Sequence, residues 1–188
     1  MDETELVREG IEESAKAVKA LSAQEIIVAK DIIAKAMSSG GKLLICGNGG
    51  SAADAQHMAG ELVGRFKMER KALTAISLST DTSILTALAN DYGAKAIFAR
   101  QVEALGTDGD VLLAISTSGT SPNIIAAVEQ AKKTGMKVIG MTGAQGGKLK
   151  EMSDATITSA SSDTPRIQEA HATAIHLLCQ MLEAQLTA

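Results

Sequence analysis

The chain has very few aromatic residues: it contains no Trp, one Tyr and two Phe among 188 residues. Its core must therefore be built from Ala, Ile, Leu, Val and Met, and small side chains of this kind let helices pack closely. The hydrophobic fraction of 45% is nevertheless ordinary for a globular protein. A chain of this length can bury a full core without disulfides, so we expect residues 1–188 to form a single domain.

Cysteines and long apolar runs are also scarce. Cys46 and Cys179 lie in segments expected to be a buried strand and a helix, so we interpret them as reduced core thiols of a cytoplasmic protein. No apolar run approaches the ~18 residues needed to span a bilayer. Residues 1–5 are acidic and lack the basic flank and apolar stretch of a signal peptide.

The chain has no excess of positive charge, because its formal net charge is −4 and its pI is near 5.4. This balance argues against a general binder of nucleic acids or membrane surfaces. The first 40 residues are neither basic nor long enough to indicate a DNA-binding segment. A sugar-phosphate-sensing regulator of transcription is therefore disfavoured.

Two helices are expected before strands and helices begin to alternate. Residues 4–20 carry an apolar stripe at helical spacing, and Ser22 with Glu25 forms a capping-box pattern that opens a second helix ending at 40–41. Strands are expected at 42–46, 72–78, 110–115, 136–141 and 154–158. Further helices are expected at 52–66, 82–90, 95–105, 122–134, 147–152 and 164–186. This alternation predicts an α/β fold, a three-layer α/β/α sandwich with a five-stranded parallel sheet of the doubly wound, flavodoxin-like kind.

The most informative loop, residues 47–51, follows the first expected strand. Its sequence Gly-Asn-Gly-Gly-Ser lets backbone N–H groups approach an anion at the start of the next helix, where Asn48 and Ser51 add side-chain hydrogen bonds. The turn lacks the third glycine of a dinucleotide fingerprint, and no acidic residue ends the next strand. A Rossmann nucleotide cofactor is therefore not expected.

A second loop, residues 116–121, contains several hydroxyl groups and follows another apolar strand. Ser121 suits the N-cap and Pro122 the first position of the next helix. The simplest interpretation is a turn that only caps a helix. Because it occurs together with the loop at 47–51, we favour a phosphate site. No Walker lysine is present, which disfavours hydrolysis of nucleoside triphosphates.

The chain has only three histidines, in two segments. His57 and Glu61 are four residues apart and share one helix face. His171 lies on the apolar stripe of the last helix and is expected to be a hydrogen-bonded core or interface residue. His176 lies on the less apolar side with Glu183, so it is either a solvated surface residue or part of a site.

Four of these polar residues also form a candidate zinc site. Two imidazoles and a carboxylate suit Zn²⁺, and an amide oxygen is an acceptable further ligand. The candidate ligands are His57, Glu61, Gln168 and His176. A His-x-x-x-Glu spacing is common on helices, so the spacing alone does not establish metal binding.

The motifs together resemble a known family. They are CGNGGS at 46–51, HMAGE at 57–61, NDYG at 90–93, GDVLLAISTSG at 109–119, and RIQEAH at 166–171 followed by His176. The chain resembles bacterial sedoheptulose 7-phosphate isomerases, also called phosphoheptose isomerases, of the sugar-isomerase (SIS) domain superfamily. The similarity covers nearly the whole chain. It implies an aldose–ketose isomerase of ADP-heptose and lipopolysaccharide synthesis, and a homotetramer whose sites lie between subunits and whose N-terminal segment 1–40 serves oligomerisation.

The resemblance also implies roles for individual residues. Glu61 and His176 would be the catalytic acid/base pair, acting through an enediol. Phosphate would be held by Ser116, Thr117, Ser118 and Ser121. The sugar chain would be contacted by Asn48, Gly49, Gly50, Asn90, Asp91 and Gln168, with Ser51 and Glu61 also lining the site. Some members bind zinc through the equivalents of His57, Glu61, Gln168 and His176.

Two comparisons with the family bear on the predicted site and function. Pro165 lies where some members carry an aspartate proposed to touch substrate, and Asp163 is a candidate replacement. Some proteins of the same subfamily are non-catalytic adaptors that bind the replication initiator protein. These adaptors resemble this chain in the loops but lack the paired Glu and His at the positions of Glu61 and His176. The presence of both residues here favours the isomerase.

Overall fold

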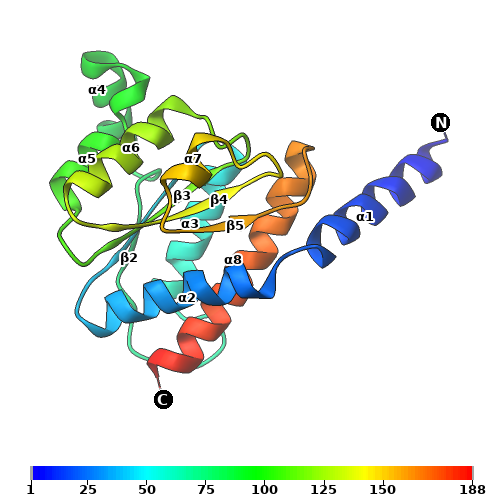
Figure 1. Ribbon diagram of the computed structural model, residues 1–188, viewed down its shortest axis with the longest axis horizontal. Coiled ribbons are helices and arrows are strands. Elements are labelled where there is room, and N and C mark those ends of the chain that lie inside the picture. Colours follow the sequence, from blue (N-terminus) through cyan, green and yellow to red (C-terminus); the bar gives the residue numbers. More distant parts are fainter. Residues whose placement is uncertain (1, 188) are drawn as a thin grey trace.

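The five expected strands form one parallel sheet in the order β2-β1-β3-β4-β5 (Figure 1). The computed structural model describes residues 2–187. The strands are β1 Leu43–Gly47, β2 Ala75–Ser77, β3 Val111–Ser116, β4 Lys137–Thr142 and β5 Ala155–Thr158. The strand order confirms the doubly wound α/β prediction, and it reverses direction between β1 and β3.

Helices cover both faces of the sheet. They are α1 Glu3–Lys19, α2 Ala23–Ser38, α3 Gly50–Val63, α4 Thr82–Tyr92, α5 Ala99–Leu105, α6 Pro122–Lys133, α7 Gly147–Met152 and α8 Thr164–Leu186, with a short 3₁₀ helix η1 at Ala94–Ala96. One core cluster joins the sheet to α2, α3 and α8, and a second joins it to α5, α6 and α7. The three layers follow from strands that are apolar on both faces.

Three local differences from the sequence expectation have physical causes. β2 is shorter than predicted because this edge strand pairs only over Ala75–Ser77 with β1. The helix expected at 95–105 is divided into η1 and α5 beside Phe98, whose side chain is buried in the second core. At the start of α2, Ser22 accepts the N–H of Glu25, but the Glu25 carboxylate accepts the N–H of Thr158 instead of closing a capping box.

The N-terminal helix α1 extends away from the body of the molecule (Figure 1). Its apolar stripe is exposed in the single chain, since Val7 is 60% and Ile11 is 64% exposed. Ala17, near its end, is buried. The amphipathic helix is therefore confirmed, while Val7 and Ile11 on its apolar face are left uncovered by the other residues among 2–187.

Both cysteines are buried and unpaired, as expected for core thiols. Burial raises the pKa of Cys46 to about 12. The pKa of Cys179 is also about 12, chiefly through burial. Within residues 2–187, none of the helices has the length and apolar character needed to cross a membrane.

Candidate active site

A polar hollow of about 240 Å³ lies at the carboxyl end of the sheet, where the strand order reverses. The loop after β1, the loop after β3 and the start of α8 form its walls. The lining residues are Asn48, Gly49, Gly50, Ser51, Ile115, Ser116, Thr117, Ser121, Thr164 and Gln168. The structure thus gathers in one place eight of the residues expected to contact a phosphorylated ligand.

Three helices begin at this hollow. Gly50 and Ser51 open α3, Ser121 precedes α6 as its N-cap, and Thr164 opens α8. Unpaired backbone N–H groups and the positive ends of the helix dipoles favour an anion at such a point. No lysine or arginine is among the lining residues. Neutral donors would therefore bind the anion, as predicted for phosphate.

The serine hydroxyls of the second loop contact each other. Ser116 Oγ lies 3.0 Å from Ser121 Oγ and 3.5 Å from Ser118 Oγ. Ser118 faces an adjoining hollow of about 280 Å³, which shares Thr117 and Thr164 with the first. The hydroxyl groups of Ser116, Ser118 and Ser121 thus form a hydroxyl cradle, which lies between two neighbouring polar hollows.

Glycines let the loop after β1 turn tightly. Gly49 has φ of 55°, a value that favours glycine, and a Cβ on Gly47 would lie 2.3 Å from the carbonyl oxygen of Ser51. A Cβ on Gly50 would lie 2.4 Å from Nε2 of Gln168. The glycines thus bring α3 close to α8 at the hollow.

A pair of amides ties the two loops together, which the sequence analysis did not anticipate. The Asn48 side chain donates to Asn123 Oδ1 at 2.9 Å, and Asn123 donates back to Asn48 Oδ1 at 2.8 Å. Asn123 also accepts the N–H of Ile124 within α6. Asn123 therefore fixes the orientation of Asn48 at the edge of the hollow.

The residues predicted to carry the chemistry come together further along α3 and α8. His57 Nε2 lies 2.8 Å from His176 Nε2, and the two rings meet edge to face. His57 Nε2 also lies 3.6 Å from Glu61 Oε1. His57 and Glu61 share one face of α3, as the spacing predicted. A single protomer therefore brings His57, Glu61 and His176 into one cluster.

The hollow and this cluster lie at two levels of the same helix pair. Gly50 faces Gln168, and His57 faces His176. At about 1.5 Å per residue, His57 lies roughly 10 Å along the α3 axis from Gly50. The distance between the two levels is therefore within the length of an extended small molecule.

The donor set of the cluster has the chemical character of a zinc site. Tetrahedral zinc with Zn–N distances of about 2.0–2.1 Å needs ligand nitrogens roughly 3.3 Å apart. The 2.8 Å between His57 and His176 is instead the separation of hydrogen-bonded imidazoles. Within the part of the chain that the structure describes, no group of three or more His, Cys, Asp or Glu is arranged to hold a metal.

Asp54 adds an unexpected carboxyl group near the cluster. One turn before His57 on α3, its Oδ2 is buried without a hydrogen-bond partner. Burial raises the pKa of Asp54 to about 6, with an opposing effect from His57. Sequence reasoning missed this residue because an Asp on a helix ordinarily faces solvent.

The structure does not bring Asn90 and Asp91 to the hollow of their own chain. Both lie near the end of α4, where Asn90 donates to Asp91 at 2.7 Å. α4 has no buried residue, and Tyr92 beside them is 60% exposed. These two residues are therefore displayed at the surface of the protomer.

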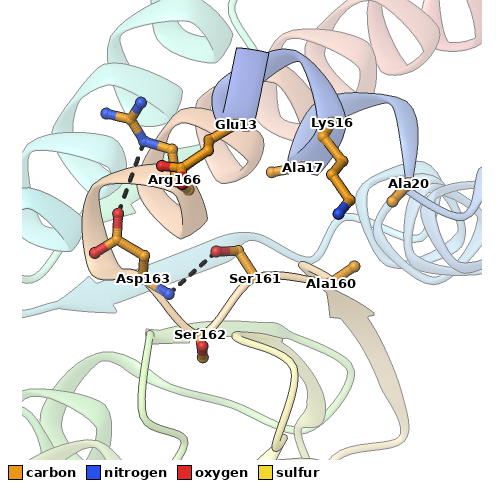
Figure 2. Close-up of a pocket in the computed structure, with 9 residues that line it drawn as sticks. All are labelled: Glu13, Lys16, Ala17, Ala20, Ala160, Ser161, Ser162, Asp163 and Arg166. Carbon is orange, nitrogen blue, oxygen red and sulfur yellow. Dashed lines mark hydrogen bonds and ion pairs between the residues drawn. The ribbon is translucent and has the colours of Figure 1, made fainter. Parts of the chain in front are cut away.

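Asp163 points toward Arg166 of α8 (Figure 2). Its carboxylate lies 3.9 Å from Arg166 Nε, and its N–H donates to Ser161. Arg166 also pairs with Glu169 and donates to the carbonyl of Gly10 in α1. Asp163 lines a separate groove of about 410 Å³ between α1 and residues 160–163, and it is not among the residues that line the polar hollow.

The other polar residues of α8 differ in their surroundings. His171 is fully buried, and its Nε2 lies 3.1 Å from the carbonyl oxygen of Thr142, which confirms the core interpretation. Burial lowers the pKa of His171. Glu183, which the sequence placed on the less apolar side, is only 2% exposed because it pairs with buried Arg70.

The parallel sheet with a hydroxyl-lined hollow at its switch point defines a doubly wound α/β domain with a candidate anion site. Residues 8–143 match the SIS domain family, which confirms this class. The chain is 52% identical to phosphoheptose isomerase of Helicobacter pylori (strain P12), over 94% of this chain and 90% of that protein. It is 50% identical to phosphoheptose isomerase of Geotalea uraniireducens (strain Rf4), over 99% of this chain and 98% of that protein.

Two solved structures agree with these sequence relatives. Phosphoheptose isomerase from Neisseria gonorrhoeae superposes with a TM-score of 0.91 at 42% identity, over 96% of this chain and 98% of that chain. The phosphoheptose isomerase from Francisella tularensis gives a TM-score of 0.93 at 40% identity, over 98% and 100%. The chain belongs to the phosphoheptose isomerase family and is an isomerase.

Proposed function

We propose that this chain converts D-sedoheptulose 7-phosphate to D-glycero-D-manno-heptose 7-phosphate. This reaction would be the first step toward ADP-heptose and the lipopolysaccharide core, and it would take place in the cytoplasm. The buried, unpaired cysteines accord with a reducing compartment. The names of the similar proteins support a phosphorylated heptose as substrate.

One observation supports the proposal above the others. An anion hollow without basic side chains and a His57–Glu61–His176 cluster lie at two levels of α3 and α8. In an open-chain heptose 7-phosphate, the phosphate and the carbons C1 and C2 lie at opposite ends. The phosphate in the hydroxyl cradle would therefore direct the reacting end toward the cluster.

The proposed reaction moves one proton between carbons and one between oxygens. Glu61 removes a proton from C1 of the ketose and forms an enediol, and a proton returned to C2 gives the aldose. His176 transfers the proton between the oxygens on C1 and C2. Asn48 and Gln168 hold the hydroxyl groups of the sugar, while Ser116, Thr117, Ser118 and Ser121 hold the phosphate.

We assign zinc to the cluster as a further part of the proposal. His57, Glu61, Gln168 and His176 would hold one ion in each subunit, because imidazole, carboxylate and amide groups suit Zn²⁺. To bind it, His57 and His176 would have to move apart from 2.8 Å, and the Gln168 side chain, which faces Gly50, would have to turn toward them. A bound ion would polarise the carbonyl oxygen of the substrate. Elemental analysis of the purified protein and of His57→Gln would test the assignment through metal content rather than activity.

The active assembly is proposed to be a homotetramer with sites between subunits. The exposed apolar stripe of α1 and the exposed helix α4 support this arrangement, since both need a partner. A neighbouring subunit would then present Asn90 and Asp91 to the hollow. No nucleic acid, membrane or nucleotide cofactor is required.

Incubation of the purified protein with sedoheptulose 7-phosphate in D₂O tests the function. We expect an aldose with deuterium bound to C2, because the proton that Glu61 removes from C1 would exchange with solvent before a proton is returned to C2. A parallel reaction with a chelator measures the need for metal. Absence of turnover with and without added zinc would contradict the isomerase and favour the non-catalytic adaptor.

A further inference from the structure

The segment after α3 contains a buried ion pair that has no role in the proposed chemistry. Arg70 Nε lies 3.1 Å from Glu183 Oε1, and the side chains are 1% and 2% exposed. Glu183 also accepts the backbone N–H groups of Phe66, Lys67 and Met68 at 3.0, 2.8 and 2.9 Å. One carboxylate of α8 therefore fixes the path of residues 66–70.

Arg70 reaches from this pair to the end of α3. Its Nη2 donates to the carbonyl oxygen of Glu61 at 2.9 Å, and its Nη1 donates to that of Leu62 at 2.8 Å. α3 ends at Val63, so these carbonyls belong to the last turn and lack partners within the helix. A cation at this position also complements the helix dipole. Arg70 therefore fixes the backbone that carries the Glu61 side chain.

The same segment reaches His176 through Phe66. The Phe66 ring lies 5.7 Å from the His176 ring, with 32° between the planes. Glu183 lies seven residues after His176 on α8, hence on the same side of that helix. Both proposed acid/base groups are thus connected to one buried pair, Glu61 through its carbonyl and His176 through Phe66.

We infer that Arg70 and Glu183 are positioning residues for the Glu61–His176 pair, an inference that rests on the proposed function for its kinetic consequences. Neither residue touches the hollow. The pair fixes the last turn of α3 against α8, so that carboxylate and imidazole keep a constant relative position. A displacement of about 1 Å between reacting groups can lower a rate about 100-fold.

Two conservative substitutions separate positioning from mere stabilisation. Arg70→Lys keeps a positive charge beside Glu183 but lacks the planar fork that reaches the carbonyl oxygens of Glu61 and Leu62 together. Glu183→Gln keeps the size of the side chain and removes its charge. The matched control is Asp110→Asn, because Asp110 is another buried carboxylate that accepts two backbone N–H groups and pairs with a lysine, but it precedes β3 and has no hydrogen bond to α3 or α8.

The expected result is a fall in kcat of about 10- to 100-fold for Arg70→Lys and Glu183→Gln, with KM changed less than about threefold. Asp110→Asn should lower the melting temperature and leave kcat unchanged. The imidazole C–H resonances of His176 should also move in the first two variants and stay in place in the control. With only three histidines, these signals can be assigned by substitution.

The resonances decide the inference even if the wild-type protein lacks the proposed activity, because they report the position of His176 directly. Unchanged His176 signals in Arg70→Lys and Glu183→Gln would overturn it. So would losses of kcat no larger than that of Asp110→Asn. If neither variant folds, Phe66→Leu leaves the ion pair intact and removes only the ring. Unchanged His176 signals in that variant would overturn the connection through Phe66.

Discussion

Among single residues, Glu61 and His176 carry the proposed proton transfers, and their environments differ. The Glu61 side chain is 25% exposed, so burial and solvent access are both partial. His176 lies between His57 and Phe66, in contact with one ring on each side. A ligand can thus approach Glu61 and His176, while the neighbouring rings of His57 and Phe66 limit the movement of the His176 side chain.

Replacement of either group should abolish most of the activity. We expect Glu61→Gln and His176→Gln each to lower turnover at least about 100-fold, because one acid/base group typically contributes ~10²–10⁴ in rate. The fold should persist, since both side chains are partly accessible to solvent. Initial rates with sedoheptulose 7-phosphate, together with circular dichroism, measure the two effects. Glu69→Gln is the matched control because its carboxylate is 90% exposed; near-normal turnover in both variants would reject the assigned roles.

Asp110 gives a prediction about stability and pH. Burial alone would raise the pKa of Asp110, but hydrogen bonds from Lys42 and Thr107 outweigh burial and hold the pKa below its ordinary value of 3.8. The ionised carboxylate therefore stabilises the protein above about pH 4, and this contribution disappears as the pH falls through the lowered pKa. We expect Asp110→Asn to cost about 1–3 kcal/mol at pH 7.

Urea unfolding of Asp110→Asn and wild type at several pH values measures this contribution. The difference in free energy of unfolding should be constant from pH 7 to about 5 and shrink at lower pH. A difference that stays the same down to pH 2 would contradict the assigned pKa direction.

Among the helices and strands, the close approach of α3 and α8 at Gly50 determines the width of the hollow. The φ angle of Gly50 is one that other residues adopt, so the lack of a side chain matters for space rather than for backbone conformation. The nearest group is the flexible end of Gln168. A larger residue at this position would therefore move Gln168 without unfolding the protein.

We expect Gly50→Ala to raise KM about tenfold, equivalent to about 1.4 kcal/mol of lost binding, because the new methyl group displaces Gln168 into the hollow. Steady-state kinetics and a melting curve check the result. Gly60→Ala is the control on the same helix, since a Cβ there meets nothing within 4 Å. Equal KM values for the two variants would show that Gln168 does not contact the substrate.

The sequence was sufficient to predict most elements and most of the hollow, because these depend on local patterns. Apolar runs followed by glycine or serine identified β1 and β3, and their loops form the walls of the hollow. The burial of Glu183 could not be predicted, since its partner Arg70 is 113 residues away in the chain. The same holds for Asn123, which acts through a distant amide rather than through a motif.

At the scale of the whole molecule, two exposed surfaces fit the proposed assembly of subunits. Leu6, Val7 and Ile11 form an apolar stripe on α1 and are each at least 60% exposed. Asn90 and Asp91 lie on α4, which contributes no buried residue. A single protomer therefore contains the polar hollow and the His57–Glu61–His176 cluster, but it does not bring every residue expected to contact substrate to one place.

A mixing experiment tests whether neighbouring subunits complete each other's sites. Glu61→Gln lacks the proposed base, whereas Asp91→Ala lacks a residue that the proposal places in the hollow of a neighbour, so each variant alone should be inactive. Co-expression with two affinity tags yields mixed oligomers in which about a quarter of the sites combine an intact Glu61 with an intact Asp91 from another chain. We expect activity near that fraction of wild type. Mixed oligomers that contain both chains, verified by mass spectrometry, and that remain inactive would show that Glu61 and Asp91 serve the same protomer, and the proposal of shared sites would fail.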